Sequence, residues 1–150
     1  MIHKKTTGAS GEMYVAYDLL RQGYVVFKEL GDNSHVDLIA IIDKQPIRIQ
    51  VKTTNIKQIS NKYHAAGVAF ISTLKCGPNG YRYKYDIEEI DVFAIYVKDK
   101  NIVLYINAKE IGDKRSFSIR FDKSKNAQSV NVNMYDKYLN ILDSVYKTNA

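Results

Sequence analysis

The fold is decided by residues 36–53, which read VDLIAIIDKQPIRIQVKT. The first part, Val36–Ile42, is apolar on both faces after its opening acid, a pattern typical of a central strand. The second part, Ile47–Thr53, alternates apolar and polar residues, which predicts a strand with one buried face and one polar face. The residues expected on its polar face are Arg48, Gln50 and Lys52.

The turn between these two strands determines which residues face one another. Asp43–Pro46 reads as a four-residue turn, so Ile42 is expected to pair with Ile47. Counting back along both strands places Asp37 opposite Lys52, with side chains roughly 5 Å apart. The hairpin therefore predicts a patch that holds an acid, an ammonium and, two residues along, an amide. A slip of one residue in the register would disperse this patch.

A helix is expected to precede the hairpin. Ser10 can cap it and Gly23 can end it, and its apolar stripe consists of Ala16, Leu19 and Leu20. Glu12 lies at the end of that stripe, where an unpaired acid is out of place. The structural alternative is an acid that only interacts with the helix dipole near the helix N-terminus.

The rest of the chain supplies more strands and one last helix. Strands are predicted over Tyr24–Lys28, Gly67–Leu74, Val92–Lys98, Ile102–Asn107 and Ser116–Phe121. Asn133 can cap a helix that runs to Lys147, with an apolar face of Tyr135, Leu139, Leu142 and Tyr146. The polar stretch Asn55–His64 yields no assignment. Together the pattern predicts a mixed α+β (α/β) fold, with one central mixed sheet flanked by helices in a single domain over residues 1–150.

Composition narrows the class of protein and its compartment. With 150 residues and 45% hydrophobic content, the chain is sized for one domain with its own core. No apolar run is long enough to span a bilayer, and no secretory signal is visible at the N-terminus. Cys76 is the only cysteine, which excludes an intrachain disulfide. We therefore expect a cytoplasmic protein without a membrane partner.

The charge distribution favours a polyanionic partner. The formal net charge is +6, and residues 53–84 contain five cations and no acid. Residues 111–133 contain five cations and two acids. The candidates for contacts with DNA are Arg82, Lys84, Lys114, Arg115, Lys123 and Lys125. Charge alone fits an ordinary solvated surface equally well.

Residues 81–85, YRYKY, alternate aromatic and basic side chains. As a strand, this segment would place its two cations on one face and its three tyrosines on the other. A two-stranded ribbon of this kind fits the major groove of DNA. A sheet whose tyrosines pack inward is the alternative.

The patch around Asp37 has the chemistry that phosphodiester hydrolysis requires. A hard cation takes up charge on the phosphate and lowers the pKa of a bound water, and magnesium prefers oxygen ligands. Asp37, Glu12 and the Val51 carbonyl can supply such oxygens. Lys52 can orient the attacking water and stabilise developing negative charge. A structural salt bridge between Asp37 and Lys52 is the alternative.

These residues resemble the signature of the PD-(D/E)XK nucleases, which is an acid followed further along by acid-x-Lys at the end of a strand. Here the signature reads Val36-Asp37 and then Gln50-Val51-Lys52, without the proline and with an amide for the second acid. The wider order is similar to that of homing endonucleases encoded in bacterial group I introns. The similarity rests on Gly11-Glu12, Leu19-Leu20, Gly23–Val26, Gly31–Asn33, Asp37-Leu38 and Ile49–Thr53, and continues more loosely in Asp91–Tyr96, Ile119-Arg120 and Asn126.

The resemblance implies a restriction-endonuclease-like core and a site-specific endonuclease that cuts double-stranded DNA. It implies Mg²⁺, or another divalent cation such as Mn²⁺, as cofactor, and a catalytic set of Glu12, Asp37, Gln50 and Lys52. It also implies a bacterial cytoplasmic protein that forms a homo-oligomer, at least a dimer, with a tetramer favoured. The alternatives are a Holliday-junction resolvase, a restriction-like nuclease, and a non-catalytic DNA-binding module on the same fold, because Gln50 replaces an acid.

Overall fold

The computed structural model describes residues 4–31, 33–61, 64–123 and 132–146. The elements run in the order α1 (Lys4–Arg21), β1 (Val25–Lys28), β2 (Leu38–Ile42), β3 (Gln45–Thr54), β4 (Ile56–Asn61), β5 (His64–Ser72), β6 (Leu74–Cys76), β7 (Arg82–Lys84), β8 (Val92–Val97), β9 (Ile102–Asn107), α2 (Ala108–Ile111), β10 (Ser116–Arg120), the 3-10 helix η1 (Tyr135–Tyr138) and α3 (Ile141–Tyr146). None of the described helices combines the length and the apolar character that a bilayer crossing needs.

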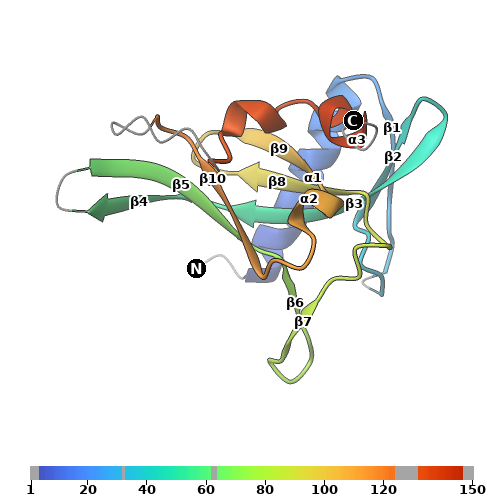
Figure 1. Ribbon diagram of the computed structural model, residues 1–150. Helices are drawn as coiled ribbons and strands as arrows, with labels where there is room; N and C mark the ends of the chain where they lie inside the picture. Colours follow the sequence, from blue (N-terminus) through green and yellow to red (C-terminus); the bar gives the residue numbers. More distant parts are fainter. Residues whose placement is uncertain (1–3, 32, 62–63, 124–131, 147–150) are drawn as a thin grey trace.

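A five-stranded mixed sheet forms the centre of the molecule, as the sequence predicts. Its strand order is β1-β2-β3-β8-β9. The β3–β8 pair is parallel, and the other neighbouring pairs are antiparallel. Helix α1 packs along one face, against β3, β8 and the β1–β2 pair (Figure 1). The resulting α+β architecture, a central mixed sheet flanked by helices, confirms the predicted fold class.

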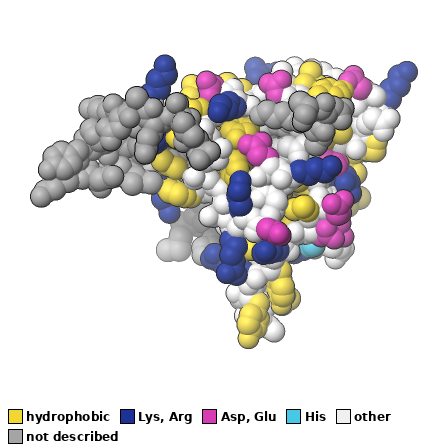
Figure 2. Space-filling view, viewed as in Figure 1, with side chains coloured by type: hydrophobic (Ala, Val, Ile, Leu, Met, Phe, Trp, Pro, Cys, Tyr) yellow, Lys and Arg dark blue, Asp and Glu magenta, His cyan; other side chains and the backbone are white. Residues whose placement is uncertain are grey.

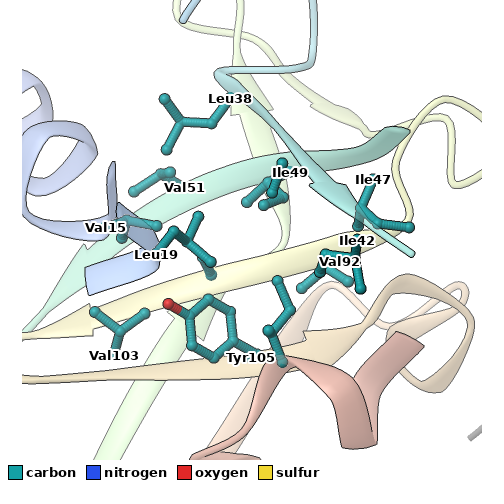
Figure 3. Packing of buried hydrophobic residues seen from close by; sticks show 13 residues of the cluster. Val15, Leu19, Leu38, Ile42, Ile47, Ile49, Val51, Val92, Val103 and Tyr105 are labelled. Atoms are coloured by element: carbon teal, nitrogen blue, oxygen red, sulfur yellow. The ribbon is translucent and has the colours of Figure 1, made fainter. Parts of the chain in front are cut away.

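Two hydrophobic cores lie on opposite faces of this sheet. Val15 and Leu19 of α1 pack on Ile49 and Val51 of β3 in the first core (Figure 3). Phe93 of β8 belongs to the second core, which lies toward β5, β10 and η1. Because successive residues of a strand point to opposite faces, β8 contributes to both cores and is apolar throughout.

The chain forms two further sheets that the sequence does not reveal. Strands β10, β5 and β4 make an antiparallel three-stranded sheet, and β6 pairs with β7 in a short ribbon. The stretch Asn55–His64 contains β4, and its polar composition conceals a strand at the edge of this smaller sheet. The ribbon projects from the body at its lower edge in Figure 1. The predicted single sheet is therefore correct for the core and incomplete outside it.

The first helix starts earlier than its predicted cap. Ser10 lies inside α1, where its hydroxyl donates to the Thr7 carbonyl. The packing of Val15 and Leu19 on the sheet anchors the helix, and adding turns to an existing helix costs little. The predicted end is correct: Gly23 has φ +90 and follows the last helical residue, Arg21, by two positions.

The predicted turn of the β2–β3 hairpin is wrong by two residues. Asp43 and Lys44 both have positive φ, and Ile42 pairs with Gln45 rather than with Ile47. A two-residue turn of this kind matches the right-handed twist of the strands, and aspartate tolerates the left-handed region. Pro46 fits because β8 pairs with β3 only from Ile49 onward, so its missing N–H leaves no ladder bond unmade.

The predicted C-terminal helix is two short helices. The side chain of Asn140 accepts a hydrogen bond from the Leu142 N–H and so begins α3 after η1 has ended. This break rotates the apolar face, and the buried side chains are Tyr138, Ile141 and Ser144. Of the face predicted from the sequence, Leu139 is 46% exposed and Tyr146 is 47% exposed. Lys147 lies outside the described residues.

Candidate active site

The carboxylate of Asp37 lies at the start of the central hairpin and is tied to the neighbouring strand. Its backbone N–H donates to the Ile49 carbonyl at 2.9 Å, which extends the β2–β3 ladder by one residue. Its Oδ2 accepts from the backbone N–H of Val51 at 2.7 Å and from Nε2 of Gln50 at 2.5 Å. Two donors therefore fix the carboxylate against β3.

Gln50 occupies the centre of this arrangement and is only 8% exposed. The two-residue shift of register places it, rather than Lys52, opposite Asp37. Because the shift is an even number of residues, the predicted set still shares one face of the sheet. Nε2 of Gln50 also donates to the Val51 carbonyl at 3.1 Å, so this amide links the acid to a backbone oxygen.

Lys52 lies on the same face, two residues further along β3. Its Nζ donates to the hydroxyl of Tyr85 at 2.6 Å and lies 3.5 Å from the Leu74 carbonyl oxygen. The ammonium also lies 4.6 Å from the centroid of the Tyr85 ring. Burial lowers the pKa of Lys52 to about 8, against the opposing attraction of Asp37.

Glu12 reaches the site from α1 and carries a partner of its own. Its carboxylate forms an ion pair with Lys28, the last residue of β1. The preceding residue, Gly11, lies so close to β3 that an added Cβ would collide with the side chain of Thr53. The absence of a side chain at Gly11 therefore lets the helix bring Glu12 to the edge of the sheet.

The electrostatics of Asp37 connect these groups into one site. Burial raises the pKa of Asp37 to about 6, and the nearby charge of Glu12 adds to this rise. The hydrogen bond from the Val51 N–H and the charges of Lys52 and Lys28 oppose it. The predicted residues Glu12, Asp37, Gln50 and Lys52 are thus brought together.

The oxygens around Asp37 suit a hard divalent cation. They belong to the carboxylates of Asp37 and Glu12 and to the Val51 carbonyl, whereas the Gln50 amide turns its Nε2 toward Asp37 and Val51. Among the described residues, no group of three or more His, Cys, Asp or Glu side chains is arranged to hold a metal. Magnesium commonly binds proteins through one or two carboxylates and keeps several waters, so this acid-poor set fits it better than zinc.

A family model described as PD-(D/E)XK endonuclease matches residues 2–141. The chain belongs to the PD-(D/E)XK endonuclease family. In this PD-(D/E)XK chain, Asp37, Gln50 and Lys52 follow the order of acid, acid and lysine that the family name abbreviates, with an amide in the second position. Nucleases of the family generally use divalent metal ions.

Two individual proteins are similar to this PD-(D/E)XK chain. Protein 5.3 of Escherichia phage T7 is 30% identical over 105 residues, which cover 70% of this chain and 81% of the phage protein. The solved structure of a bacterial homing endonuclease, I-Ssp6803I, superposes with a TM-score of 0.66 at 19% identity. That superposition covers 85% of this chain and 84% of the other, and it supports the fold.

Two residues at the site of this PD-(D/E)XK protein were missed from the sequence. In the sequence Lys28 marks only the end of a strand, but its pairing with Leu38 turns it toward α1 and Glu12. Tyr85 stands in the sequence as one member of an alternating run of tyrosines. Its ring packs edge-to-face on Phe93 and on His35, with centroid distances of 5.6 Å and 5.5 Å. The strand alternation of β1 could have revealed Lys28, whereas Tyr85 depends on tertiary contacts.

The cations predicted to contact DNA fall into two places. Arg82 and Lys84 lie on β7, and Lys84 is 3.5 Å from a carboxylate oxygen of Asp113. Lys114 and Arg115 lie beside the same region, because their carbonyls accept hydrogen bonds from Thr73 just before β6. Lys123 follows the opposite end of β10. Lys125 lies outside the described residues.

The tyrosines of the 81–85 run do not pack inward together. Tyr81 is 67% exposed and Tyr83 is 55% exposed, whereas Tyr85 is half-buried against the central sheet. The space-filling view shows hydrophobic side chains along the projecting ribbon and Lys and Arg side chains where it joins the body (Figure 2). The ribbon is thus an exposed aromatic and basic element attached next to Lys52.

Proposed function

We propose that this protein is a site-specific endonuclease that hydrolyses phosphodiester bonds of double-stranded DNA with a divalent cation, Mg²⁺ or a substitute such as Mn²⁺. The observation that carries the proposal is the convergence of Asp37, Gln50 and Lys52 on one sheet face, with Glu12 beside them. A half-buried carboxylate whose pKa is raised to about 6 is an unfavourable charge in the folded protein. A bound cation would remove that cost.

The cation would be held by Asp37, Glu12 and the Val51 carbonyl, with Gln50 as a neutral ligand or positioning group. When bound, it would stabilise charge on the scissile phosphate and acidify a water molecule. Gln50 and the Val51 N–H hold the Asp37 carboxylate in one orientation, so that little reorganisation is needed during the reaction. Lys52 supplies a positive charge for the developing oxyanion and can orient the attacking water.

Contacts with the DNA backbone would come from the basic residues around the ribbon. Arg82, Lys84, Lys114 and Arg115 lie near the site, and Arg82 on the exposed ribbon is the candidate for reading bases. Lys123 and Lys125 are proposed phosphate contacts further away. Most of the binding energy of such surfaces comes from phosphates and does not depend on sequence.

A double-strand cut requires two active sites related by symmetry, because one site of this type cuts one strand. We therefore propose a homo-oligomer, at least a dimer, with a tetramer favoured because several copies extend the DNA that one assembly can read. A homing enzyme carried by a group I intron in the bacterial cytoplasm is the narrower form of the proposal. It is supported by the similarity in residue order to such enzymes.

The test is cleavage of a plasmid library with Mg²⁺ or with EDTA, followed by sequencing of the ends. We expect double-strand ends at one recurrent sequence with Mg²⁺ and none with EDTA. Asp37→Ala and Lys52→Ala should lose cleavage and keep DNA binding, because binding draws on many phosphate contacts. Light scattering of the same samples reports the assembly state, and a monomer bound to its target would contradict the oligomer.

One observation favours a second candidate, a DNA-binding module without catalysis. Gln50 replaces an acid and donates its Nε2 to the Asp37 carboxylate, which occupies part of the oxygen that a cation would use. That candidate predicts specific binding with no cut under Mg²⁺ or Mn²⁺. A four-way junction included in the same assay separates a third outcome, because a junction resolvase would cut it in preference to linear duplex.

A further inference from the structure

The ammonium of Lys52 is turned toward the base of the β6–β7 ribbon. Its hydrogen-bond acceptors are the Tyr85 hydroxyl at 2.6 Å and the Leu74 carbonyl at 3.5 Å. Among the described residues, no carboxylate oxygen lies within the roughly 4 Å of an ion pair from this nitrogen. Two neutral oxygens therefore hold the Lys52 ammonium in place, although the negative charge of Asp37 attracts it.

Both acceptors belong to the two ends of the ribbon. Leu74 begins β6 and pairs with Lys84, the last residue of β7, and Tyr85 follows directly. The rest of the ribbon projects into solvent and carries Arg82 together with the exposed Tyr81 and Tyr83 (Figure 1). Both acceptors therefore lie at the base of the ribbon, where it joins the body.

The Tyr85 ring is itself held against the central sheet. It packs edge-to-face on Phe93, which is buried and pairs with Gln50 across β3 and β8. It also packs edge-to-face on His35, whose Nδ1 lies 2.8 Å from a carboxylate oxygen of Glu89. These contacts fix the ring from two sides, so the position of its hydroxyl is determined by packing.

We propose that Tyr85 is a positioning residue that holds the Lys52 ammonium at the base of the β6–β7 ribbon and away from Asp37. The hydroxyl keeps the flexible side chain extended toward Tyr85 and Leu74 and leaves the Asp37 carboxylate open to a cation. This inference rests on the proposed nuclease function.

The decisive variant is Tyr85→Phe, which keeps the ring contacts with Phe93 and His35 and removes only the acceptor oxygen. The matched control is Tyr83→Phe, which removes a hydroxyl from the same ribbon without touching Lys52. The loss of a hydrogen bond to a charged group at the transition state corresponds to a rate loss of roughly ten- to a hundredfold. We expect that loss in single-turnover cleavage of saturating target DNA by Tyr85→Phe, with DNA affinity unchanged within about twofold.

A second readout is independent of activity. The rate at which Lys52 reacts with an acetylating reagent, measured by mass spectrometry on the metal-free protein, reports whether the ammonium has left its position. We expect this rate to change at least about threefold in Tyr85→Phe, as the loss of one hydrogen bond implies, and to stay at the wild-type value in Tyr83→Phe. Equal thermal stability of the two variants identifies the change as local.

Wild-type cleavage or an unchanged Lys52 acetylation rate in Tyr85→Phe would overturn the proposal. So would a loss of DNA affinity with an unchanged rate at saturation, because Tyr85 would then be a DNA contact. If the wild-type protein cuts no DNA, the nuclease function fails. In that case the acetylation rates alone decide whether Tyr85 positions Lys52.

Discussion

Nε2 of Gln50 donates to Oδ2 of Asp37 at 2.5 Å, across the central hairpin. The amide in the family's second acid position is therefore a donor to the first acid. An amide adds no negative charge to a carboxylate whose pKa burial already raises to about 6. This arrangement favours the folded, metal-free protein, and a cation bound there would have one negatively charged ligand fewer.

The Gln50→Glu and Gln50→Ala pair tests that relationship. We expect cleavage to decline less in Gln50→Glu than in Gln50→Ala, because glutamate keeps the volume and supplies the family's acid. In EDTA, Gln50→Glu should lower the melting temperature, since two carboxylates would face each other, and Mg²⁺ should restore it. Cleavage by Gln50→Ala at the wild-type rate across a magnesium titration would show that the amide has no role.

Asp37→Asn should stabilise the metal-free protein at neutral pH. The Asp37 pKa is raised to about 6 in the folded protein, and an aspartate titrates near 4 in an unfolded chain. The folded state therefore binds the proton more tightly, so the stabilisation from Asp37 is fully present below about pH 4 and is lost as the pH rises through about 6. Asparagine keeps an oxygen acceptor for Val51 and Gln50 and does not titrate.

Urea denaturation in EDTA at several pH values measures this effect. The stability difference in favour of Asp37→Asn should be small near pH 4 and grow to at most about 3 kcal/mol near pH 7. Adding Mg²⁺ should stabilise the wild type more than the variant, because Asp37→Asn leaves Glu12 as the one carboxylate of the proposed ligand set. A difference in unfolding free energy that is constant with pH would contradict the inference that burial disfavours the ionised form of Asp37.

The close approach of Gly11 to β3 predicts opposite effects for two glycines of one helix. Gly11→Ala should destabilise the protein by about 1–3 kcal/mol, because its Cβ would displace Thr53 or push α1 off the sheet. Gly8→Ala meets no atom within 4 Å and should stabilise it by roughly 0.5–1 kcal/mol. Denaturant midpoints of the two variants check this, and equal shifts of the same sign would contradict it.

The sequence predicts the central hairpin and its catalytic candidates because strand alternation tolerates an even error of register. The turn was wrong by two residues, yet Asp37, Gln50 and Lys52 kept their common face. The residues that contact this catalytic set could not be predicted from sequence spacing. Tyr85 and Lys28 reach it from other strands and loops, and only tertiary packing places them there.

The two outer sheets escaped prediction for a related reason. Strand β4 is a polar strand in a small sheet, so it lacks the apolar period that identifies a core strand. The prediction of one C-terminal helix is wrong for a different reason. Asn140 caps a second helix within an apolar pattern that is continuous in the sequence. One side-chain hydrogen bond thereby changed which face of the segment is buried.

The positions of the basic residues near the two ends of β10 lead to a prediction of where DNA binds. Lys84 and Arg115 are near the base of the ribbon, whereas Lys123 lies beyond the opposite end of β10, away from Lys52. If DNA passes over the ribbon base, the double variant Lys84→Ala with Arg115→Ala should weaken binding to every sequence. It should also flatten the dependence of log affinity on log salt by roughly 0.9 for each phosphate that the variant no longer neutralises.

Lys123→Ala is the matched comparison and should change DNA affinity and salt slope less. A salt titration of DNA affinity on target and scrambled duplexes measures both quantities. A flatter slope for Lys123→Ala together with an unchanged slope for the double variant would place the DNA along the far end of β10 instead.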